Sequence, residues 1–415
     1  MEQHTDRRRE YCLDGIKFIA CMIIFWTHFV GAFYSLCAVN PGLSPRMERL
    51  LTGSPLKILT DSAMMLMIFM MISGYLAAGK RIRTFRELWQ SAVFRYLRFA
   101  VPFLLVNLLV SALWYSVGFR TQEAAELLHN DWVRGFYVIP VTPALAVREA
   151  VTLGSLANGP LWMMRHLAGA TCAVYVYTYL RERISSVRGN TDRPEGGKSP
   201  AFRGTWALPA ADLAVLAAVS AFCSFAEKHL LWNGMYLVQA CFLGVFLRHL
   251  PEPSEALRER FRAGFTALAV LGIALEAQGY VTILKLVFQA VGAEVPAWLR
   301  WNAWYCMGFS FLFLWAVRYS GWPKRLLETK AMRRISAISF SVFLVHWPVT
   351  AAFSFRLLLR MVNTMSYNRV FVFILAVTTL AVCVAGWLYE MSCGRLADRV
   401  SQALQKMVRR RWPVS

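Results

Sequence analysis

A histidine near the middle of the first long apolar segment could carry a proton in a reaction or in transport. His28 lies in the run 11–29, and Asp14 and Lys17 stand at the entrance to that run. An ionisable side chain at this depth of a bilayer costs several kcal/mol unless it faces a polar interior. Eleven positions separate Lys17 from His28, which on an α-helix is about 16 Å of rise and about 20° from a whole number of turns. Both side chains therefore share one helix face with Asp14, which favours chemistry or transport over a simple anchor.

Two arginines mark the start of the third apolar segment. Arg95 and Arg98 stand three positions apart, so they share a helix face. Paired guanidinium groups form a fork that suits phosphates, such as those of a nucleotide-bearing donor. Anchoring at the cytoplasmic membrane surface is the alternative, and it explains most arginines at this depth.

A second histidine and two serines lie inside other apolar segments. His346 is followed by Pro348, which can loosen a helix and free backbone carbonyls, and Ser339 stands one heptad earlier on the same face. A satisfied core histidine is an equally good interpretation of His346. Ser73 precedes Gly74 in the second segment, where close helix packing would explain both small residues. Ser73 is not expected to be a nucleophile, because no local residue identifies a base that would activate it.

Further polar residues occupy the outer halves of two other segments. Trp162, Arg165 and His166 belong to the fourth segment, and Glu276 belongs to the seventh. Unpaired charges are costly there, so a buried ion pair between Arg165 and Glu276 is one interpretation. The other is that these side chains, together with His346, line or support an acceptor site.

The segments that must position these residues are apolar blocks of about twenty residues, the length that crosses a bilayer. The chain has 415 residues, of which 57% are hydrophobic and 17% are charged. This composition is typical of an all-α, polytopic membrane protein. Ten spans are predicted, at residues 13–37, 60–79, 92–117, 160–180, 207–225, 230–249, 263–281, 301–319, 337–358 and 369–391.

The charge of the chain fits this topology. A net charge of +21 would favour nucleic-acid binding in a soluble protein. Here the predicted inward segments carry most of the 45 Lys and Arg residues, as the positive-inside rule expects when both termini are cytoplasmic. Anionic membrane lipids are then incidental partners, and no nucleic-acid partner is expected. The nine cysteines show no zinc-like spacing, so no metal site and no cofactor are expected.

No soluble domain is predicted. Residues 1–394 form one transmembrane domain, and residues 395–415 form a basic cytoplasmic tail that is expected to lie as a helix at the membrane interface. The outward segment 118–159 could fold over the outer mouth as a lid or acceptor platform, or simply pack at the interface. The inward loop 181–206 is rich in Gly and Pro and is predicted to be flexible. No internal repeat is evident, which disfavours an inverted-repeat transporter.

Taken together, the ordered motifs resemble the bacterial membrane-bound acyltransferase family 3 over nearly the whole chain. The resemblance is to the stand-alone form, because no extracellular esterase-like domain follows the last span. It is carried by residues 13–20, similar to the family's Leu-Asp-Gly-Leu-Arg-Gly-Ile-Ala with a histidine eleven residues after the basic position; 69–74, similar to Phe-x-x-Ser-Gly; 95–98 with Pro102, similar to Arg-x-x-Arg and a following proline; 160–162, similar to a Leu-Trp motif; 338–348, similar to Ser-Tyr-Ser-x-Tyr-Leu-x-His-x-Pro; and 387–390, similar to the final helix. Lys17 stands where the family has arginine, and Arg165-His166 stands where many members carry an acidic segment.

The resemblance implies a multi-pass enzyme of the bacterial plasma (inner) membrane. It would transfer an acyl group from acyl-CoA to a hydroxyl of a cell-envelope sugar or polysaccharide. The resemblance implies that this group is acetyl. Acyl-CoA would be the co-substrate and would approach from the cytoplasm. Its phosphates would bind to Lys17, Arg95 and Arg98, with Asp14 and Ser73 beside them. His28 would be the general base on the acceptor hydroxyl, or would itself take the acyl group.

Two other functions stay open on the residues alone. A flippase or exporter of a polar glycan or lipid-linked sugar could use His28, Glu276 and His346 as a proton relay. A scaffold that joins envelope polysaccharide assembly proteins would have no activity of its own, and it would tolerate alanine at every motif residue.

Overall fold

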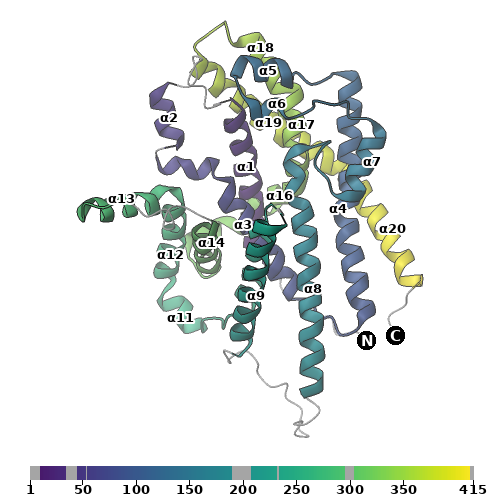
Figure 1. Ribbon diagram of the computed structural model, residues 1–415, viewed down its shortest axis with the longest axis vertical. Coiled ribbons are helices and arrows are strands. Elements are labelled where there is room, and N and C mark those ends of the chain that lie inside the picture. The colour runs from purple at the N-terminus through teal and green to yellow at the C-terminus, as the bar shows by residue number, and fades with distance from the viewer. Residues whose placement is uncertain are drawn as a thin grey trace.

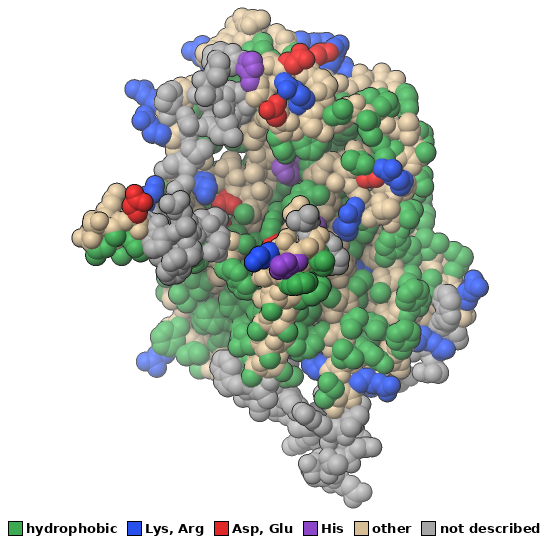
Figure 2. All heavy atoms as spheres, viewed as in Figure 1, with side chains coloured by type: hydrophobic (Ala, Val, Ile, Leu, Met, Phe, Trp, Pro, Cys, Tyr) green, Lys and Arg blue, Asp and Glu red, His purple; other side chains and the backbone are tan. Residues whose placement is uncertain are grey.

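The computed structural model describes residues 10–33, 44–52, 54–188, 207–230, 233–294 and 303–411. This part of the chain is built from helices and contains no β-strand, so the all-α prediction is confirmed. In Figure 1 the long helices lie side by side along the vertical axis, and several short helices gather at the upper end. Figure 2 shows broad hydrophobic areas on the same face, bordered along the lower edge by Lys and Arg side chains.

A helix overlaps each of the ten predicted spans. These helices are α1 Tyr11–Phe33, α3 Ser62–Ala78, α4 Phe85–Ser116, α8 Met163–Arg188, α9 Ala207–His229, α10 Tyr236–His249, α12 Arg262–Ala274, α14 Ala303–Val317, α17 Ser339–Val349 and α19 Tyr367–Tyr389. Among the described residues, five helices are long and apolar enough to cross a membrane, and three more are apolar but shorter. The count of ten spans, and the side of the membrane that each terminus faces, stay predictions.

Shorter elements connect these helices. They are α2 Pro45–Thr52, η1 Pro55–Thr60, α5 Thr121–Leu128, α6 Asp131–Arg134, α7 Pro143–Thr152, η2 Gly159–Trp162, α11 Glu255–Arg260, η3 Leu275–Gly279, α13 Tyr280–Ala290, α15 Trp322–Leu327, α16 Lys330–Ser336, η5 Thr350–Ser354, α18 Phe355–Met361, η6 Glu390–Gly394 and α20 Arg395–Arg411.

The centre of the bundle is formed by α1, α3 and α17. A helix that is apolar around most of its circumference belongs inside a bundle, and α1 is buried along most of its length. It packs against α3 and α17, and α3 in turn packs against α8, α10 and α14. Gly74 and Gly244 allow α3 and α10 to approach closely, because a Cβ on either glycine would collide with a backbone carbonyl of the other helix. The expected small-residue packing at Gly74 is confirmed.

A hydrogen-bonded network ties four helices together at one end of the bundle. The guanidinium of Arg318 donates to Glu10 (3.2 Å) and to the hydroxyl of Tyr75 (2.6 Å). Tyr75 donates to Glu10 (2.6 Å) and accepts from Arg248 (2.8 Å). The starts of α1 and the ends of α3, α10 and α14 therefore lie together. We call this the basic end, and the end near α5 and α6 the lid end.

The predicted outward segment 118–159 divides into two parts. The first part, α5 and α6 (residues 121–134), lies over the end of α1, where the side-chain amide of Asn130 donates to the carbonyls of Gly31 and Ala32 (2.9 and 3.0 Å). We call residues 121–134 the lid. The second part, α7, packs along α4 instead, and the Tyr96 hydroxyl donates to the carbonyl of Val151 (2.8 Å). Only half of the segment therefore covers the bundle end.

Two boundaries differ from the prediction, and the predicted tail helix is present. The span 263–281 is not one regular helix, since α12 passes through the π-helical turn η3 into α13, which points away from the body in Figure 1. The loop expected at 181–206 begins later, because α8 continues to Arg188; residues 189–206 lie outside the described residues. The expected tail helix is present as α20, which follows α19 through the turn η6 and packs against α4.

Candidate active site

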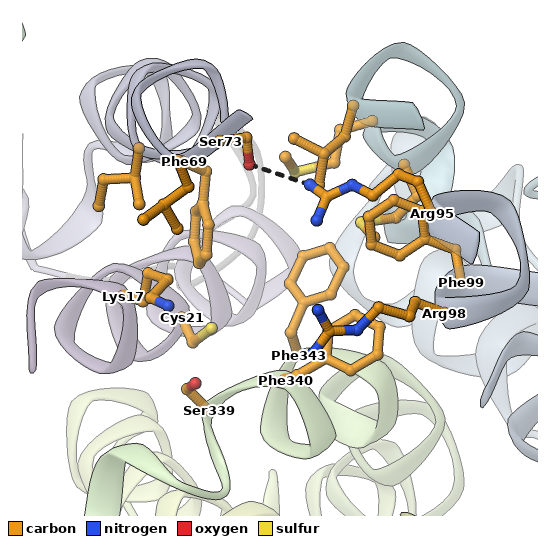
Figure 3. A pocket seen from close by; sticks show the side chains of 15 residues that line it. Lys17, Cys21, Phe69, Ser73, Arg95, Arg98, Phe99, Ser339, Phe340 and Phe343 are labelled. Carbon is orange, nitrogen blue, oxygen red and sulfur yellow. Dashed lines mark hydrogen bonds between the residues drawn. The ribbon is translucent and has the colours of Figure 1, made fainter. Parts of the chain in front are cut away.

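A basic pocket of about 370 Å³ opens between α1, α3, α4, α8 and α17. Four of the predicted donor-side residues line it: Lys17, Ser73, Arg95 and Arg98. Figure 3 shows their side chains pointing into the cavity from three different helices, with the hydroxyl of Ser339 on the same side as Lys17 and Cys21. Apolar and aromatic side chains form the rest of the lining. Residues that are far apart in the sequence thus form one cavity with a positive lining.

Arg95 is held in place and still has unused hydrogen-bonding capacity. Its guanidinium donates to the hydroxyls of Ser73 (3.3 Å) and Thr171 (3.4 Å), and it lies 4.6 Å from the centroid of the Phe99 ring. Its Nε is buried and has no hydrogen-bond partner in the described part of the chain. A buried donor without a partner is costly, so an anionic group in the pocket would satisfy it. Ser73 therefore positions Arg95.

The other two basic side chains are more accessible. Arg98 is exposed and belongs to the pocket wall. The ammonium of Lys17 pairs with the carboxylate of Asp14 at 2.7 Å, one helical turn earlier. Asp14 is not among the residues that line the pocket. It acts on the pocket through Lys17, because the ion pair holds the ammonium in one position.

His28 and His346 form a hydrogen-bonded pair beyond the pocket. Nδ1 of His28 lies 3.0 Å from Nε2 of His346, and the two rings are nearly parallel, with an interplanar angle of 9°. The link to the pocket is short, since Phe343 lines the pocket and stands one turn before His346 on α17. His28 is partly buried, whereas His346 is 1% exposed. The two motif histidines thus meet as one unit.

The surrounding contacts fix the tautomers of this pair. Nδ1 of His346 lies 2.6 Å from the carbonyl oxygen of Phe343. A carbonyl can only accept, so in the neutral pair Nδ1 of His346 carries the proton and its Nε2 is an acceptor. Nδ1 of His28 must then donate to that Nε2. The remaining nitrogen, Nε2 of His28, keeps a lone pair that no hydrogen bond within the described part of the chain uses, which is the requirement for a general base.

Pro348 has a specific role in the position of His346. Proline has no N–H, so the carbonyl of Leu344, four residues earlier, loses its helical partner. The side-chain amide of Asn158 donates to this carbonyl at 2.9 Å. The predicted release of a carbonyl by Pro348 is confirmed, and it fastens the segment before α8 onto α17 beside the histidine pair.

The lid contributes an aromatic surface that the sequence analysis missed. The indole of Trp132 stacks on the imidazole of His28, with centroids 5.9 Å apart and an interplanar angle of 26°. Trp132 also contacts Trp347 (5.1 Å) and Phe136 (4.9 Å). Trp347 is completely buried, but Trp132 is 43% exposed. Nothing in the sequence around the four-residue helix α6 connects Trp132 with α1. The available signal was a tryptophan in a predicted outward segment.

The remaining predicted residues lie elsewhere. Trp162 contacts the ring of His166 (5.6 Å), and Nε2 of His166 lies 2.9 Å from the carbonyl of Asn233. Arg165 is exposed. Glu276 is 1% exposed, and neither of its oxygens has a hydrogen-bond partner among the described residues. The buried ion pair between Arg165 and Glu276 was therefore a wrong prediction, because η3 turns Glu276 toward a buried region while Arg165 faces outward.

Comparison with known proteins gives one match. Residues 10–388 match the family model described as an acyltransferase domain of the acyltransferase 3 type. No curated protein and no solved structure matches the chain.

Proposed function

The chain belongs to the acyltransferase 3 family, and from this premise we propose that it transfers an acyl group from cytoplasmic acyl-CoA to a hydroxyl of a cell-envelope sugar or polysaccharide. We assign acetyl as the transferred group. The observation that carries the proposal is the sequence of groups along one path: a positively lined pocket, then the His28–His346 pair, then the exposed indole of Trp132. A phosphate-bearing donor, a base and a sugar acceptor require groups of these kinds in that order.

The basic pocket is assigned to the donor. Guanidinium and ammonium groups bind phosphates, and Arg95, Arg98 and Lys17 supply three of them. With the phosphates at the basic end, which we assign to the cytoplasm, the pantetheine arm extends along the apolar lining toward His28. The rise of about 16 Å along α1 from Lys17 to His28 separates the charged part of the donor from the reacting thioester.

His28 is assigned as the general base. Its Nε2 takes the proton of the acceptor hydroxyl while the hydroxyl oxygen attacks the thioester carbonyl. The carbon–sulfur bond then breaks, and the coenzyme A thiolate receives that proton, so the products are an ester and free coenzyme A. His346 accepts a hydrogen bond from Nδ1 of His28 throughout. This bond becomes charge-assisted when His28 is protonated, which stabilises the transition state.

The acceptor is assigned to the side of the lid. Sugar rings have apolar faces that pack on exposed aromatic side chains, and Trp132 presents such a side chain directly beside His28. The predicted acceptor-side group of Trp162, Arg165 and His166 lies at the start of α8 and is assigned no contact with the reacting hydroxyl. Bound donor and acceptor would meet at His28 from opposite directions, and this proximity supplies much of the rate.

The test uses membranes that contain the wild-type protein, His28→Ala or the control His229→Ala, whose histidine is exposed at the end of α9. Each sample receives radiolabelled acetyl-CoA and total envelope glycan, and label is counted in the polysaccharide fraction. Removal of a general base costs about 10²- to 10⁴-fold, so His28→Ala should lose the label and His229→Ala should keep it. Equal labelling by His28→Ala contradicts the assignment.

The same membranes separate an acyltransferase from a transporter. Acyl transfer needs no transmembrane proton gradient, so an uncoupler should leave the label unchanged. A proton-driven flippase or exporter predicts the opposite result: movement of glycan that stops with the uncoupler and needs no acyl-CoA.

A further inference from the structure

A second cavity of about 340 Å³ adjoins the basic pocket. The two cavities share Arg95 and Arg98, so the same guanidinium groups face both. On α4 this second cavity reaches back to Ser91, and on α8 it reaches forward to Tyr175, in both cases toward the basic end. We call it the outer cavity. It forms the approach to the basic pocket from the basic end of the bundle.

The helix α20 forms one wall of the outer cavity. Asp398, Ser401, Gln402 and Gln405 line it, and their spacings of three, four and seven residues place them on one face of the helix. The same helix is attached to α4: Ser401 donates to the carbonyl of Leu97 (3.4 Å). The family match ends at residue 388, so α20 adds a wall from outside the matched segment.

Positive charge in the outer cavity is not fully compensated. Lys80 lies at the end of α3, with its ammonium 5.4 Å from the centroid of the Tyr175 ring. Lys80 is exposed, and Arg409 adds positive charge near it while Glu87 adds negative charge. Nε of Arg95 has no hydrogen-bond partner in the described part of the chain. A bound anion would therefore give the buried Nε of Arg95 a partner, and Lys80 adds a cation at the solvent side of the cavity.

The other groups in this cavity suit a nucleotide better than a simple phosphate. The rings of Phe94 and Tyr175 line it, and aromatic side chains stack on nucleobases. The side-chain amides of Gln402 and Gln405 can each donate and accept a hydrogen bond. The carboxylate of Asp398 would repel a phosphate, but it can accept from a ribose hydroxyl or an exocyclic amine. A lipid phosphate would need the cations and none of this polar wall.

We propose that the outer cavity binds the 3′-phosphoadenosine diphosphate part of acyl-CoA, and that α20 supplies the side chains that recognise it. The proposal rests on the proposed function for the identity of the donor. In this arrangement Lys80, Arg95 and Arg98 bind the phosphates, and Gln402 and Gln405 bind the nucleoside. The pantetheine arm continues past the shared arginines into the basic pocket.

The test is direct binding of free coenzyme A to the purified full chain in detergent, which requires no acyl transfer. Wild type, the double variant Gln402→Ala/Gln405→Ala, and the control Met407→Ala are titrated with coenzyme A and with 4′-phosphopantetheine, which lacks the nucleotide. Met407 lies on α20 and is 56% exposed, and it does not line the cavity. Because Gln402 and Gln405 are at the surface of a formed helix, size-exclusion elution and thermal unfolding should match wild type.

The double variant should bind coenzyme A about tenfold more weakly, the effect of losing about two hydrogen bonds. Its affinity for 4′-phosphopantetheine should stay within about twofold of wild type, and Met407→Ala should match wild type for both ligands. Unchanged affinity for coenzyme A in the double variant overturns the role of α20 and leaves the proposed function intact. Co-purified phosphatidylglycerol that coenzyme A does not displace from the wild type would assign the cavity to a lipid headgroup and overturn the proposal. Failure of the wild type to bind coenzyme A overturns this proposal and the proposed function together.

Discussion

The hydrogen bond between His28 and His346 predicts a graded loss of activity when its acceptor is changed. His346→Ala removes the nitrogen that lies 3.0 Å from Nδ1 of His28. The bond is charge-assisted when His28 holds the proton of the acceptor, and a bond to a charged group is worth about 1.5–3 kcal/mol. Each 1.36 kcal/mol corresponds to a factor of ten in rate. We therefore expect kcat to fall about ten- to a hundredfold.

A second variant separates this effect from a loss of packing. In His346→Gln the side-chain oxygen can still accept from His28, so this variant should keep clearly more activity than His346→Ala. The two histidines act as one unit, so His28→Ala/His346→Ala should be no slower than His28→Ala alone. The KM for acetyl-CoA should stay constant in the single variants at His346, because Arg95 and Arg98 are untouched.

The assay is acetyl transfer from radiolabelled acetyl-CoA to envelope glycan at a fixed amount of folded protein, determined by size-exclusion elution in detergent. Wild-type kcat in His346→Ala would show that the pair has no role in proton transfer. Equal losses in His346→Gln and His346→Ala would show that the imidazole matters for shape rather than as an acceptor. Either result refutes the tautomer argument.

Three further predictions concern the donor, the acceptor and the fold. Arg95→Ala should raise the KM for acetyl-CoA about tenfold or more with little change in kcat. Arg95→Lys should not restore the KM, because a lysine has no bidentate fork and cannot bind a phosphate while it also donates to Ser73 and Thr171. Steady-state kinetics over a range of acetyl-CoA concentrations measure both parameters, and full rescue by lysine would contradict the assignment. Trp132→Ala should raise the KM for the glycan acceptor and leave the KM for acetyl-CoA unchanged. Trp132→Phe should raise the acceptor KM less, since it keeps an aromatic face. Equal effects on the two KM values in the same assay would argue against Trp132 as a surface that binds the acceptor. Gly74→Ala should destabilise the protein by about 1–3 kcal/mol through overpacking of α3 against α10. The control Gly308→Ala, whose added Cβ meets nothing within 4 Å, should be neutral or slightly stabilising. Thermal unfolding in detergent compares the two variants, and equal melting temperatures would show that the contact between α3 and α10 can relax.

Much of the architecture could be predicted from the sequence because its signal is local. A block of about twenty apolar residues can satisfy its backbone in a bilayer only as a helix, and a helix overlaps each of the ten blocks. The family resemblance placed Lys17, Ser73, Arg95 and Arg98 on the donor side, and these four residues line one pocket. Pro348 predicted a backbone carbonyl without a helical partner. This carbonyl belongs to Leu344, and it accepts a hydrogen bond from the side-chain amide of Asn158.

The failures occurred where long-range packing decides the outcome. The pairing of Arg165 with Glu276 depended on how α8 and α12 are rotated, and helical periodicity within a single segment does not specify the rotation of one helix against another. For residues 118–159 the sequence left open a lid or simple packing, and the structure contains both, since α5 and α6 cover the end of α1 while α7 packs along α4. From the sequence Trp132 was missed, and residues 395–415 were predicted as a basic interfacial tail without any indication of what that tail contacts.

The sequence by itself thus determined the fold class, the ionisable residues placed in apolar segments, and the family. These follow from composition, hydrophobic length and short ordered motifs, which are properties of contiguous residues. Only the tertiary structure decided that His28 and His346 are partners, that Nε2 of His28 is the free nitrogen, and that α20 lines the approach to Arg95 and Arg98. Such facts depend on the mutual rotation and depth of helices hundreds of residues apart, which packing of the whole bundle sets.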